Sequence, residues 1–344
     1  MSRHIELPPA LGRRFSCAEG RAAGVTDGRL RGPDLAAPFP GVRVRRGSAP
    51  DRRMPPDDAP ARAVPPDGAD GPAFMRVRER ALERARDFAP IMRPGEFFSH
   101  ETAALVWGGP VPAAADLERV HVAVLGQAPL RRMAGVRGHR AAPRFVRTVE
   151  CDGLRVASPA TTWASLGAWN VFALTALGDF LCRVHRDGVG RPEPGRPPLA
   201  TPDDLARALA AGPRPGIVRL REALELIRCD SWSPRETACR LVLTRSGLPE
   251  PELNVDIRRA DGRFLGCVDM AYPEYAVAVE YQGELHAESY AKDVERIAAM
   301  RAAGWDVIEV TAELYRRPGE LAARVRAALR GAGWRPGRAQ SPQV

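Results

Sequence analysis

Lysine is almost absent from this chain of 344 residues, and Lys292 is its single instance. Arginine therefore carries nearly all of the positive charge, and the formal net charge is +9 at pH 7. A basic balance favours a polyanionic partner, and arginine suits bidentate contacts with phosphate. A GC-rich genome, which encodes arginine in place of lysine, would produce the same excess. Composition therefore suggests a nucleic-acid partner without establishing one.

The chain also lacks paired cysteines, a signal segment and a long apolar run. Its six cysteines are scattered without C-x-x-C spacing, which argues against a zinc ribbon and a disulfide framework. The N-terminus has no basic-then-apolar leader. The longest apolar stretch, residues 163–181, is interrupted by Asn170 and Asp179 and predicts a buried helix. A cytoplasmic protein with no membrane association is expected.

Proline- and glycine-rich stretches divide the chain, whose length suits two or three domains. The expected fold class is α/β, with a multi-domain α+β organisation overall. The expected segments are a helix-turn-helix-like unit (1–46), a Pro-rich linker (47–72), a middle α+β domain (73–186), a Pro/Gly linker (187–200), a helical connector (201–232), a C-terminal domain (233–330) and a disordered tail (331–344).

The N-terminal unit has the pattern of a helix-turn-helix. Ser16 with Glu19 forms a capping box for a first helix, residues 27–35 predict a second short helix, and residues 40–46 alternate as a strand. A second helix in the major groove, flanked by basic residues, is the usual arrangement of DNA-binding units of this kind. The predicted DNA contacts are Thr26, Arg29, Arg31, Arg43 and Arg45. The alternative is a small helical pair that docks on the next domain.

The middle domain predicts mixed helices and strands. The expected helices cover 77–88, 99–107 and, as one long helix, 158–186; strands are expected at 120–125, 144–150 and 153–157, with a basic turn at 135–140. His100, His121 and His139 are not at metal-ligand spacing, and His100 and His121 are interpreted as structural residues. His139, with Arg137 and Arg140, either contacts phosphate or lies in a solvated loop.

The C-terminal domain places two carboxylates at the ends of short apolar strands. The helix-strand-strand-strand-helix-strand-helix order of residues 233–330 predicts a mixed sheet flanked by helices. Asp269 follows one apolar run and Glu280 follows the next. Buried carboxylates repel one another unless a cation lies between them, and Mg²⁺ is the usual cation for oxygen ligands. The pair therefore predicts a metal-dependent phosphoryl-transfer or hydrolysis site.

The same domain resembles the PD-(D/E)XK restriction-endonuclease-like superfamily, and more closely the endonuclease-like domains related to very-short-patch-repair (Vsr) nucleases. The resemblance rests on the order of Ser233-Pro-x-Glu236, a Gly-Leu-Pro turn, Asp269, Glu280 in Val-Glu-Tyr-Gln-Gly, His286, Asp293-x-x-Arg296 and Gly304-Trp305. The N-terminal and middle regions are similar to the AbiEi-type antitoxin-like regions that accompany such domains. The resemblance implies metal-dependent cleavage of DNA.

The resemblance implies a role for each acid. Asp269 and Glu280 would ligate Mg²⁺, with Mn²⁺ as a substitute, and Glu236 would complete the metal site directly or through water. Glu236 also fits a capping box with Ser233. His286 would act as a general acid or phosphate contact, or is a surface histidine.

Gln282 departs from the superfamily, which has lysine at this position. Glutamine can position water but cannot neutralise the charge of a phosphorane. Lys292 or Arg296 would supply that charge from the following helix. Asp293 and Arg296, three residues apart on a helix, are more often an intrahelical pair.

Two functions follow. The first is a Mg²⁺-dependent DNA endonuclease with an N-terminal targeting module. The second is an antitoxin-like DNA-binding regulator whose nuclease fold is weak or inactive, which Gln282 favours. The oligomeric state is left open, with a homodimer among the options.

Overall fold

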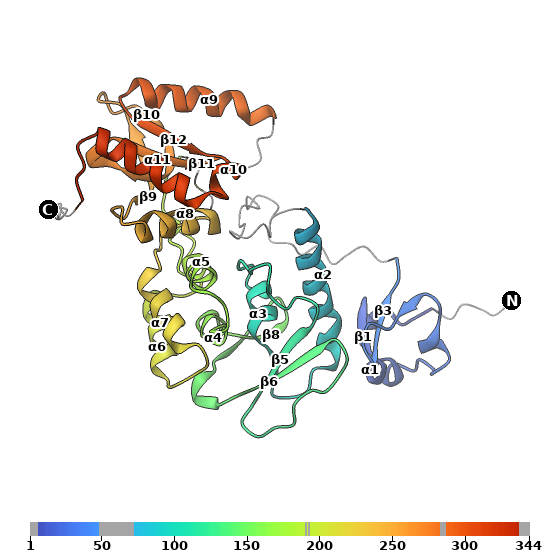
Figure 1. The fold of residues 1–344 in the computed structure, drawn as a ribbon. Coiled ribbons are helices and arrows are strands. Elements are labelled where there is room, and N and C mark those ends of the chain that lie inside the picture. The colour runs from blue at the N-terminus through green and yellow to red at the C-terminus, as the bar shows by residue number, and fades with distance from the viewer. Residues whose placement is uncertain (1–5, 48–71, 190, 192, 283–286, 337–344) are drawn as a thin grey trace. The chain divides into compact units, whose positions relative to one another are not determined.

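A computed structural model describes residues 6–47, 72–189, 191, 193–282 and 287–336 (Figure 1). The described residues form helices and three sheets, which confirms a mixed helix-and-sheet class. The chain folds into two compact units. The first unit runs up to Leu174 and includes Ala200–Glu225; the second contains Thr175–Leu199 and the chain from Leu226 onward. Within the described part of the chain, no helix has both the length and the apolar character that a bilayer crossing requires.

The first unit begins with a small antiparallel sheet in the order β1-β3-β2. Its elements are the 3-10 turn η1 (Pro9–Leu11), β1 (Arg14–Ser16), α1 (Cys17–Ala22), the 3-10 turn η2 (Arg29–Arg31), β2 (Leu35–Ala36) and β3 (Val42–Arg45). The predicted capping box is confirmed: Ser16 Oγ accepts from the Glu19 N–H, and the Glu19 carboxylate accepts from the Ser16 N–H at 2.7 Å. The small core of this sheet contains Phe15, Leu30 and Leu35.

The predicted second helix over residues 27–35 is wrong. Only the 3-10 turn η2 forms there, and Leu35 instead enters strand β2, opposite Arg45 of β3. Gly28 weakens a helix by about 1 kcal/mol, and Pro33 cannot continue one because it lacks an N–H. The described residues between α1 and β3 therefore contain no recognition helix, and the helix-turn-helix prediction is corrected to a three-stranded sheet with one short helix.

The rest of the first unit is built on a five-stranded mixed sheet in the order β6-β5-β4-β8-β7. Its elements are α2 (Pro72–Phe88), η3 (Ala89–Ile91), β4 (Glu96–Phe98), α3 (His100–Val106), β5 (Val120–Leu125), β6 (Val136–Ala141), η4 (Pro143–Phe145), β7 (Thr148–Cys151), β8 (Leu154–Ala157), α4 (Pro159–Ser165), α5 (Val171–Leu181, which continues into the second unit), α6 (Pro202–Ala210) and α7 (Ile217–Leu226). Helix α2 packs Phe88 against Phe98 and Val122 of the sheet.

Three predictions for this region are wrong. The strand expected at 144–150 is wrong in its first half, because residues 143–145 form η4 and β7 begins only at Thr148. The basic turn at 135–140 is strand β6, which pairs in parallel with β5. The single helix over 158–186 is broken into α4 and α5. At Gly167 the chain passes so close to the 215–216 loop that a Cβ would lie 2.2 Å from the Pro215 carbonyl oxygen. Asn170 then starts the next helix, because its Oδ1 accepts from the Ala173 N–H at 2.9 Å.

The second unit contains a four-stranded sheet in the order β12-β11-β10-β9, with helices on both faces (Figure 1). Its further elements are α8 (Pro234–Arg245), β9 (Glu252–Arg258), β10 (Phe264–Tyr272), η5 (Pro273–Tyr275), β11 (Val277–Tyr281), α9 (Ala287–Ala302), β12 (Asp306–Val310), α10 (Ala312–Tyr315) and α11 (Pro318–Gly331). Strands β9, β10 and β11 are antiparallel, and β11 and β12 are parallel.

Two apolar cores cover the two faces of this sheet. Residues of α8 and α11, such as Leu243 and Val325, pack with Met270 on one face. Residues of α9, such as Met300, pack with Val268 on the other. The predicted order of helices and strands in this unit is confirmed, and α10 is an addition to it.

The predicted disordered tail does not begin at residue 331. Trp334 lies beyond the end of α11, yet it is 7% exposed and belongs to the α8/α11 core. Its N–H donates to the Leu329 carbonyl oxygen at 2.9 Å, which turns the chain back onto the helix. Residues 337–344 lie outside the described residues.

Candidate functional site

Asp269 and Glu280 lie opposite each other on neighbouring strands of the second unit. The β10–β11 register pairs Met270 with Val279, so the next pair along the strands is Asp269 and Glu280. At this pair each carboxylate accepts a hydrogen bond from a backbone N–H of the neighbouring strand. The Tyr281 N–H donates to Asp269 Oδ2 at 2.7 Å, and the Asp269 N–H donates to Glu280 Oε2 at 3.2 Å. The sequence pattern placed these two acids together, and the structure brings them side by side.

The sheet bends at the position of Asp269. On β9 the residue opposite Asp269 is Asn254, whose φ of 50° lies in the left-handed region. Val268 packs into one core and Met270 into the other, so the side chains of β10 change faces across Asp269. A left-handed non-glycine residue costs about 1–2 kcal/mol, and asparagine tolerates it best. Such strain is concentrated at functional sites, and its only sign in the sequence is an asparagine within a strand.

Asn254 also connects this bend to Glu236. Its Nδ2 donates to Glu236 Oε2 at 2.9 Å, and the Trp232 N–H donates to the same oxygen at 2.8 Å. Ser233 Oγ accepts from the Glu236 N–H at 3.1 Å, as an N-cap should. The carboxylate of Glu236 therefore faces Trp232 and Asn254, which is not the reciprocal capping-box geometry.

The three acids form a buried cluster of like charges. Burial, then the charges of Glu280 and Glu236, raise the pKa of Asp269 well above its usual value. Burial also raises the pKa of Glu236 and of Glu280, and for Glu280 the neighbouring Arg296 opposes the effect. Carboxylates in this condition attract a cation, because a bound cation removes the cost of ionising them together.

Arg296 is the cation already at this cluster. From α9 its Nη2 lies 2.8 Å from Glu280 Oε1, and its Nη1 donates to the Cys267 carbonyl oxygen at 3.2 Å. The intrahelical contact with Asp293 is also present, with Nε 3.5 Å from Oδ1. Both interpretations of Arg296 are therefore seen together, and its contact with Glu280 is the shorter one.

Gln282 lies directly after the strand that carries Glu280. Its N–H donates to the Val310 carbonyl oxygen at 3.0 Å. Its side-chain Nε2 is buried and has no hydrogen-bond partner among the described residues. A buried amide donor without an acceptor costs about 1–3 kcal/mol, so this atom is suited to an acceptor such as water or a phosphate oxygen.

The other predicted site residues are only partly described. His286 lies outside the described residues, and for Lys292 only the backbone, within α9, is described. Among described His, Cys, Asp and Glu side chains, the ligand atoms of Glu236, Asp269 and Glu280 are not grouped within 4.8 Å of one another. A magnesium site here would rest on one or two carboxylates and water, which is the usual way proteins bind this ion.

The predicted DNA contacts in the first unit are largely engaged within the protein. Arg29 forms a bidentate pair with Asp34, with both N–O distances 2.8 Å. Arg43 donates to the carbonyl oxygens of Leu30 and Val42, and Arg45 donates to those of Gly12 and Pro8. Thr26 Oγ1 accepts from the Arg29 N–H at 3.3 Å, and Arg31 is exposed. Three of these arginines thus hold the small sheet together.

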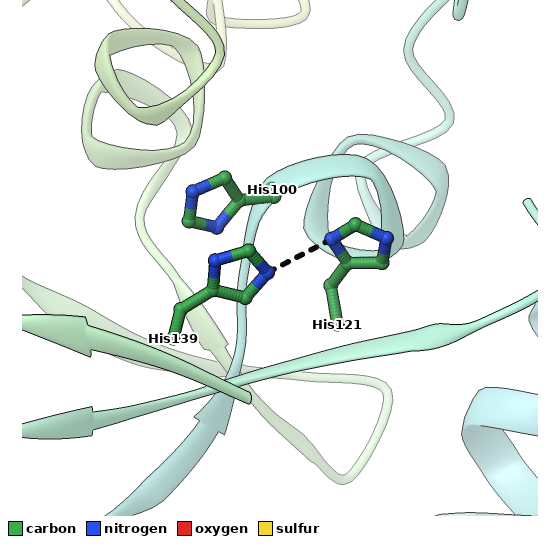
Figure 2. A group of neighbouring side chains, drawn as sticks. All are labelled: His100, His121 and His139. Atoms are coloured by element: carbon green, nitrogen blue, oxygen red, sulfur yellow. Dashed lines mark hydrogen bonds between the residues drawn. The ribbon is translucent and has the colours of Figure 1, made fainter. Parts of the chain in front are cut away.

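Sequence reasoning missed a cluster of His100, His121 and His139 in the first unit. Figure 2 shows the three rings gathered at the start of α3 and on strands β5 and β6. One nitrogen from each ring lies within 4.8 Å of the other two. His121 and Ala123 are two residues apart on β5 and point to the same face of the sheet. The β5–β6 register pairs Ala123 with His139, so the rings of His121 and His139 lie on one face. Recognising β6 as a strand would have revealed the cluster.

Acidic residues surround the histidine cluster. Glu101 Oε2 lies 2.9 Å from His121 Nδ1, and Asp116 Oδ2 lies 3.4 Å from His121 Nε2. Burial lowers the pKa of His100 to about 4 and that of His139 to about 3. Burial alone would raise the pKa of Glu101, but the neighbouring ring of His121 brings it down to about 2.

Comparison with known proteins gives little further guidance. No protein-family model matches the chain, and no solved structure matches it. Two proteins from two strains of Mycobacterium tuberculosis, Uncharacterized protein MT2308 and Uncharacterized protein Rv2248, are each 37% identical to the chain over 116 residues. The match spans 33% of this chain and 42% of each relative.

Proposed function

We propose that the second unit is a Mg²⁺-dependent DNA endonuclease that hydrolyses phosphodiester bonds. The observation that supports this is the Asp269–Glu280 pair, two buried carboxylates that the β10–β11 register places opposite each other and whose like charges repel. A carboxylate pair on two neighbouring strands, with Asp269 within β10 and Glu280 next to the last residue of β11, suits a divalent ion bound through oxygen. DNA is the proposed substrate because the chain carries a net charge of +9.

Each residue has a distinct role in the proposed site. Asp269 and Glu280 hold the ion, which would activate a water and stabilise the leaving oxygen. Glu236, fixed by Asn254 and Trp232, receives a proton or orients a metal-bound water. Gln282 offers its buried amide donor, which has no acceptor among the residues that the structure describes, to the attacking water or to a phosphate oxygen.

The test is cleavage of supercoiled plasmid by the full chain with Mg²⁺ or Mn²⁺. Asp269→Asn and Glu280→Gln should each lower the cleavage rate at least 100-fold, because each removes a ligand charge while keeping size and a carbonyl oxygen. The matched control is Glu274→Gln, the same change at an exposed residue in η5, at the far end of the β10–β11 hairpin. Glu274→Gln should cleave at the wild-type rate.

Intact plasmid after long incubation with excess wild-type protein and Mn²⁺ would rule out the endonuclease. A cleavage rate that survives in both Asp269→Asn and Glu280→Gln would place the activity elsewhere or in a contaminant.

A second candidate is a DNA-binding regulator with an inactive nuclease fold. The ion pair between Arg296 and Glu280 favours it, because this cation occupies a carboxylate that the metal needs. Binding would then occur without divalent ions and would weaken steeply with salt. Wild-type protein and Asp269→Asn would bind a random duplex equally in the presence of a chelator. Loss of all binding at 50 mM salt would exclude this candidate.

A further inference from the structure

We propose that His100, His121 and His139 bind a late first-row divalent metal ion such as Zn²⁺, with Glu101 beside the ligand nitrogen of His121. This site lies within the first unit and is separate from the acid cluster of the second unit. The ion would join the start of α3 to strands β5 and β6, across 39 residues of chain from His100 to His139 (139 − 100).

The separations between ligand atoms suit a single ion. His139 Nε2 lies 3.0 Å from His121 Nδ1, and Glu101 Oε2 lies 2.9 Å from the same Nδ1. Two nitrogens bound to zinc at about 2.0–2.1 Å in a tetrahedron lie about 3.3 Å apart. The separation of the His121 and His139 nitrogens is therefore within a few tenths of an ångström of that value, and a nitrogen of His100 lies within 4.8 Å of both.

The second nitrogens of two rings have polar neighbours that would orient them. His100 Nδ1 lies 3.0 Å from Ser99 Oγ, which leaves Nε2 of His100 as the ligand. His121 Nε2 lies 3.4 Å from Asp116 Oδ2, which leaves Nδ1 of His121 as the ligand. Ligand histidines in proteins commonly present their other ring nitrogen to a carboxylate or a hydroxyl in this way.

Hydrogen bonding alone accounts poorly for the cluster. His121 Nδ1 has two close neighbours, His139 Nε2 and Glu101 Oε2, and a single ring nitrogen offers either one proton or one lone pair. Among the described residues, Glu101 Oε2 is buried and has no partner with hydrogen-bond geometry, despite lying 2.9 Å from the ring. The same holds for His121 Nε2, on a side chain that is 2% exposed. A cation among these atoms would satisfy the ligand atoms and draw the remaining contacts into hydrogen-bond geometry.

The backbone at His100 is a separate observation. Its φ is 48°, in the left-handed region, at the first residue of α3. The resulting ring stacks on His139 with their centroids 3.7 Å apart. Strain of this kind costs on the order of 1–3 kcal/mol and persists where the neighbouring structure or a ligand depends on it.

The ligand set selects the class of metal. Imidazole nitrogen suits zinc, copper, nickel and iron, whereas Mg²⁺ prefers oxygen ligands. Three imidazoles occupy three positions of a tetrahedral zinc site and leave the fourth to a water molecule. Because the three ligands come from α3, β5 and β6, the ion would also hold these elements together.

The test uses untagged full-length protein, stripped with a chelator and then titrated with Zn²⁺ and, separately, Co²⁺. We expect one high-affinity ion per chain and, for Co²⁺, the visible absorption of a tetrahedral nitrogen- and oxygen-ligated site. His100→Gln and His139→Gln should each weaken Zn²⁺ binding at least 100-fold, and Asp116→Asn should weaken it about 10-fold.

Two controls separate this site from the other histidines and from the proposed nuclease site. His185→Gln changes a half-buried histidine of the second unit and should leave the affinity unchanged. Asp269→Asn should also leave it unchanged, so the result does not depend on the endonuclease proposal. Unchanged Zn²⁺ binding in His100→Gln and His139→Gln, or no binding by wild type, would overturn the inference.

Folding of the variants is controlled separately, because His121 is nearly fully buried. The triad variants are therefore restricted to His100 and His139, which are half-buried. Amide hydrogen exchange of β5 and β6 in wild-type protein gives an independent readout: Zn²⁺ should slow exchange there, and absence of this protection would also count against the site.

Discussion

Asn254 offers the sharpest test of how the candidate acid site is built. Its backbone is left-handed with φ 50°, and its amide donates to Glu236 Oε2 at 2.9 Å and to the Asp230 carbonyl oxygen. Asn254→Gly removes the amide but accepts the backbone conformation. Asn254→Ala removes the amide and also strains the backbone. The pair therefore separates the side chain's contribution from that of the bend.

The magnitudes follow from these contacts. Losing a donor to a charged carboxylate costs about 1.5–3 kcal/mol, and both variants share this loss. Alanine adds a cost of about 1–2 kcal/mol for the left-handed conformation. Glycine loses about 0.5–1 kcal/mol more than alanine in conformational freedom on folding, which offsets part of that gap. Asn254→Ala is thus expected to be less stable than Asn254→Gly by about 0.5–1 kcal/mol.

Amide hydrogen exchange on peptides from β9 and β10 measures the difference in local stability between Asn254→Ala and Asn254→Gly. It does so without treating the two units as one cooperative unfolding transition. The matched control is Arg258→Gly against Arg258→Ala, at the exposed end of β9 where φ is not left-handed. There glycine should be the less stable by about 0.5–1 kcal/mol. If alanine is also the more stable residue at position 254, Asn254 does not hold the bend and the strain argument is refuted.

Further predictions concern other contacts of the two units. Arg240→Leu should lower the free energy of unfolding of the second unit in urea by about 3–5 kcal/mol. The reason is that Asp179, which is 1% exposed and lies 3.0 Å from Arg240, would be left as a buried charge without this cation. Recovery of stability in the double variant Arg240→Leu with Asp179→Leu would support this, and an unchanged stability of Arg240→Leu alone would contradict it. Gln282→Lys should raise Mg²⁺-dependent plasmid cleavage about 10-fold by adding the missing charge, and an unchanged rate would show that charge is not limiting. Arg45→Ala should speed proteolysis of the N-terminal sheet, because Arg45 donates to the Gly12 and Pro8 carbonyl oxygens. Its DNA affinity should stay within about twofold of the wild-type value. A large loss of affinity with normal protease resistance would instead support the predicted DNA contact of Arg45.

The second unit was predictable because its strands are short apolar runs between turn residues. Residues 264–270 and 276–281 were expected as strands, and β10 and β11 occupy them with shifts of one or two residues. Antiparallel pairing across the short η5 connection then brings Asp269 opposite Glu280. The left-handed backbone of Asn254 could not be predicted, because it results from the change of face between the two cores.

The first unit was harder because its signals depend on distant partners. Strand β6 has no apolar alternation of its own and is ordered by parallel pairing with β5. The break at Gly167 depends on the 215–216 loop, nearly fifty residues away in sequence. The histidine cluster could be predicted only from the parallel pairing of β5 with β6 together with the position of α3. Spacing along the chain does not indicate either one, so the cluster was missed.

Arg296 bears on two features that weaken the proposed active site, the missing positive charge at Gln282 and the existing ion pair of Glu280. Gln282 supplies no positive charge, and Glu280 is engaged by Arg296 before any metal arrives. Arg296 is half-buried on α9, and it also donates to the Cys267 carbonyl oxygen. If Asp269 and Glu280 held a divalent ion, the guanidinium of Arg296 would be available for a phosphate oxygen, a contact that suits arginine. We propose that Arg296 would neutralise Glu280 in the free protein and contact the phosphate in the reaction, and that it only partly replaces the charge of the lysine that position 282 lacks.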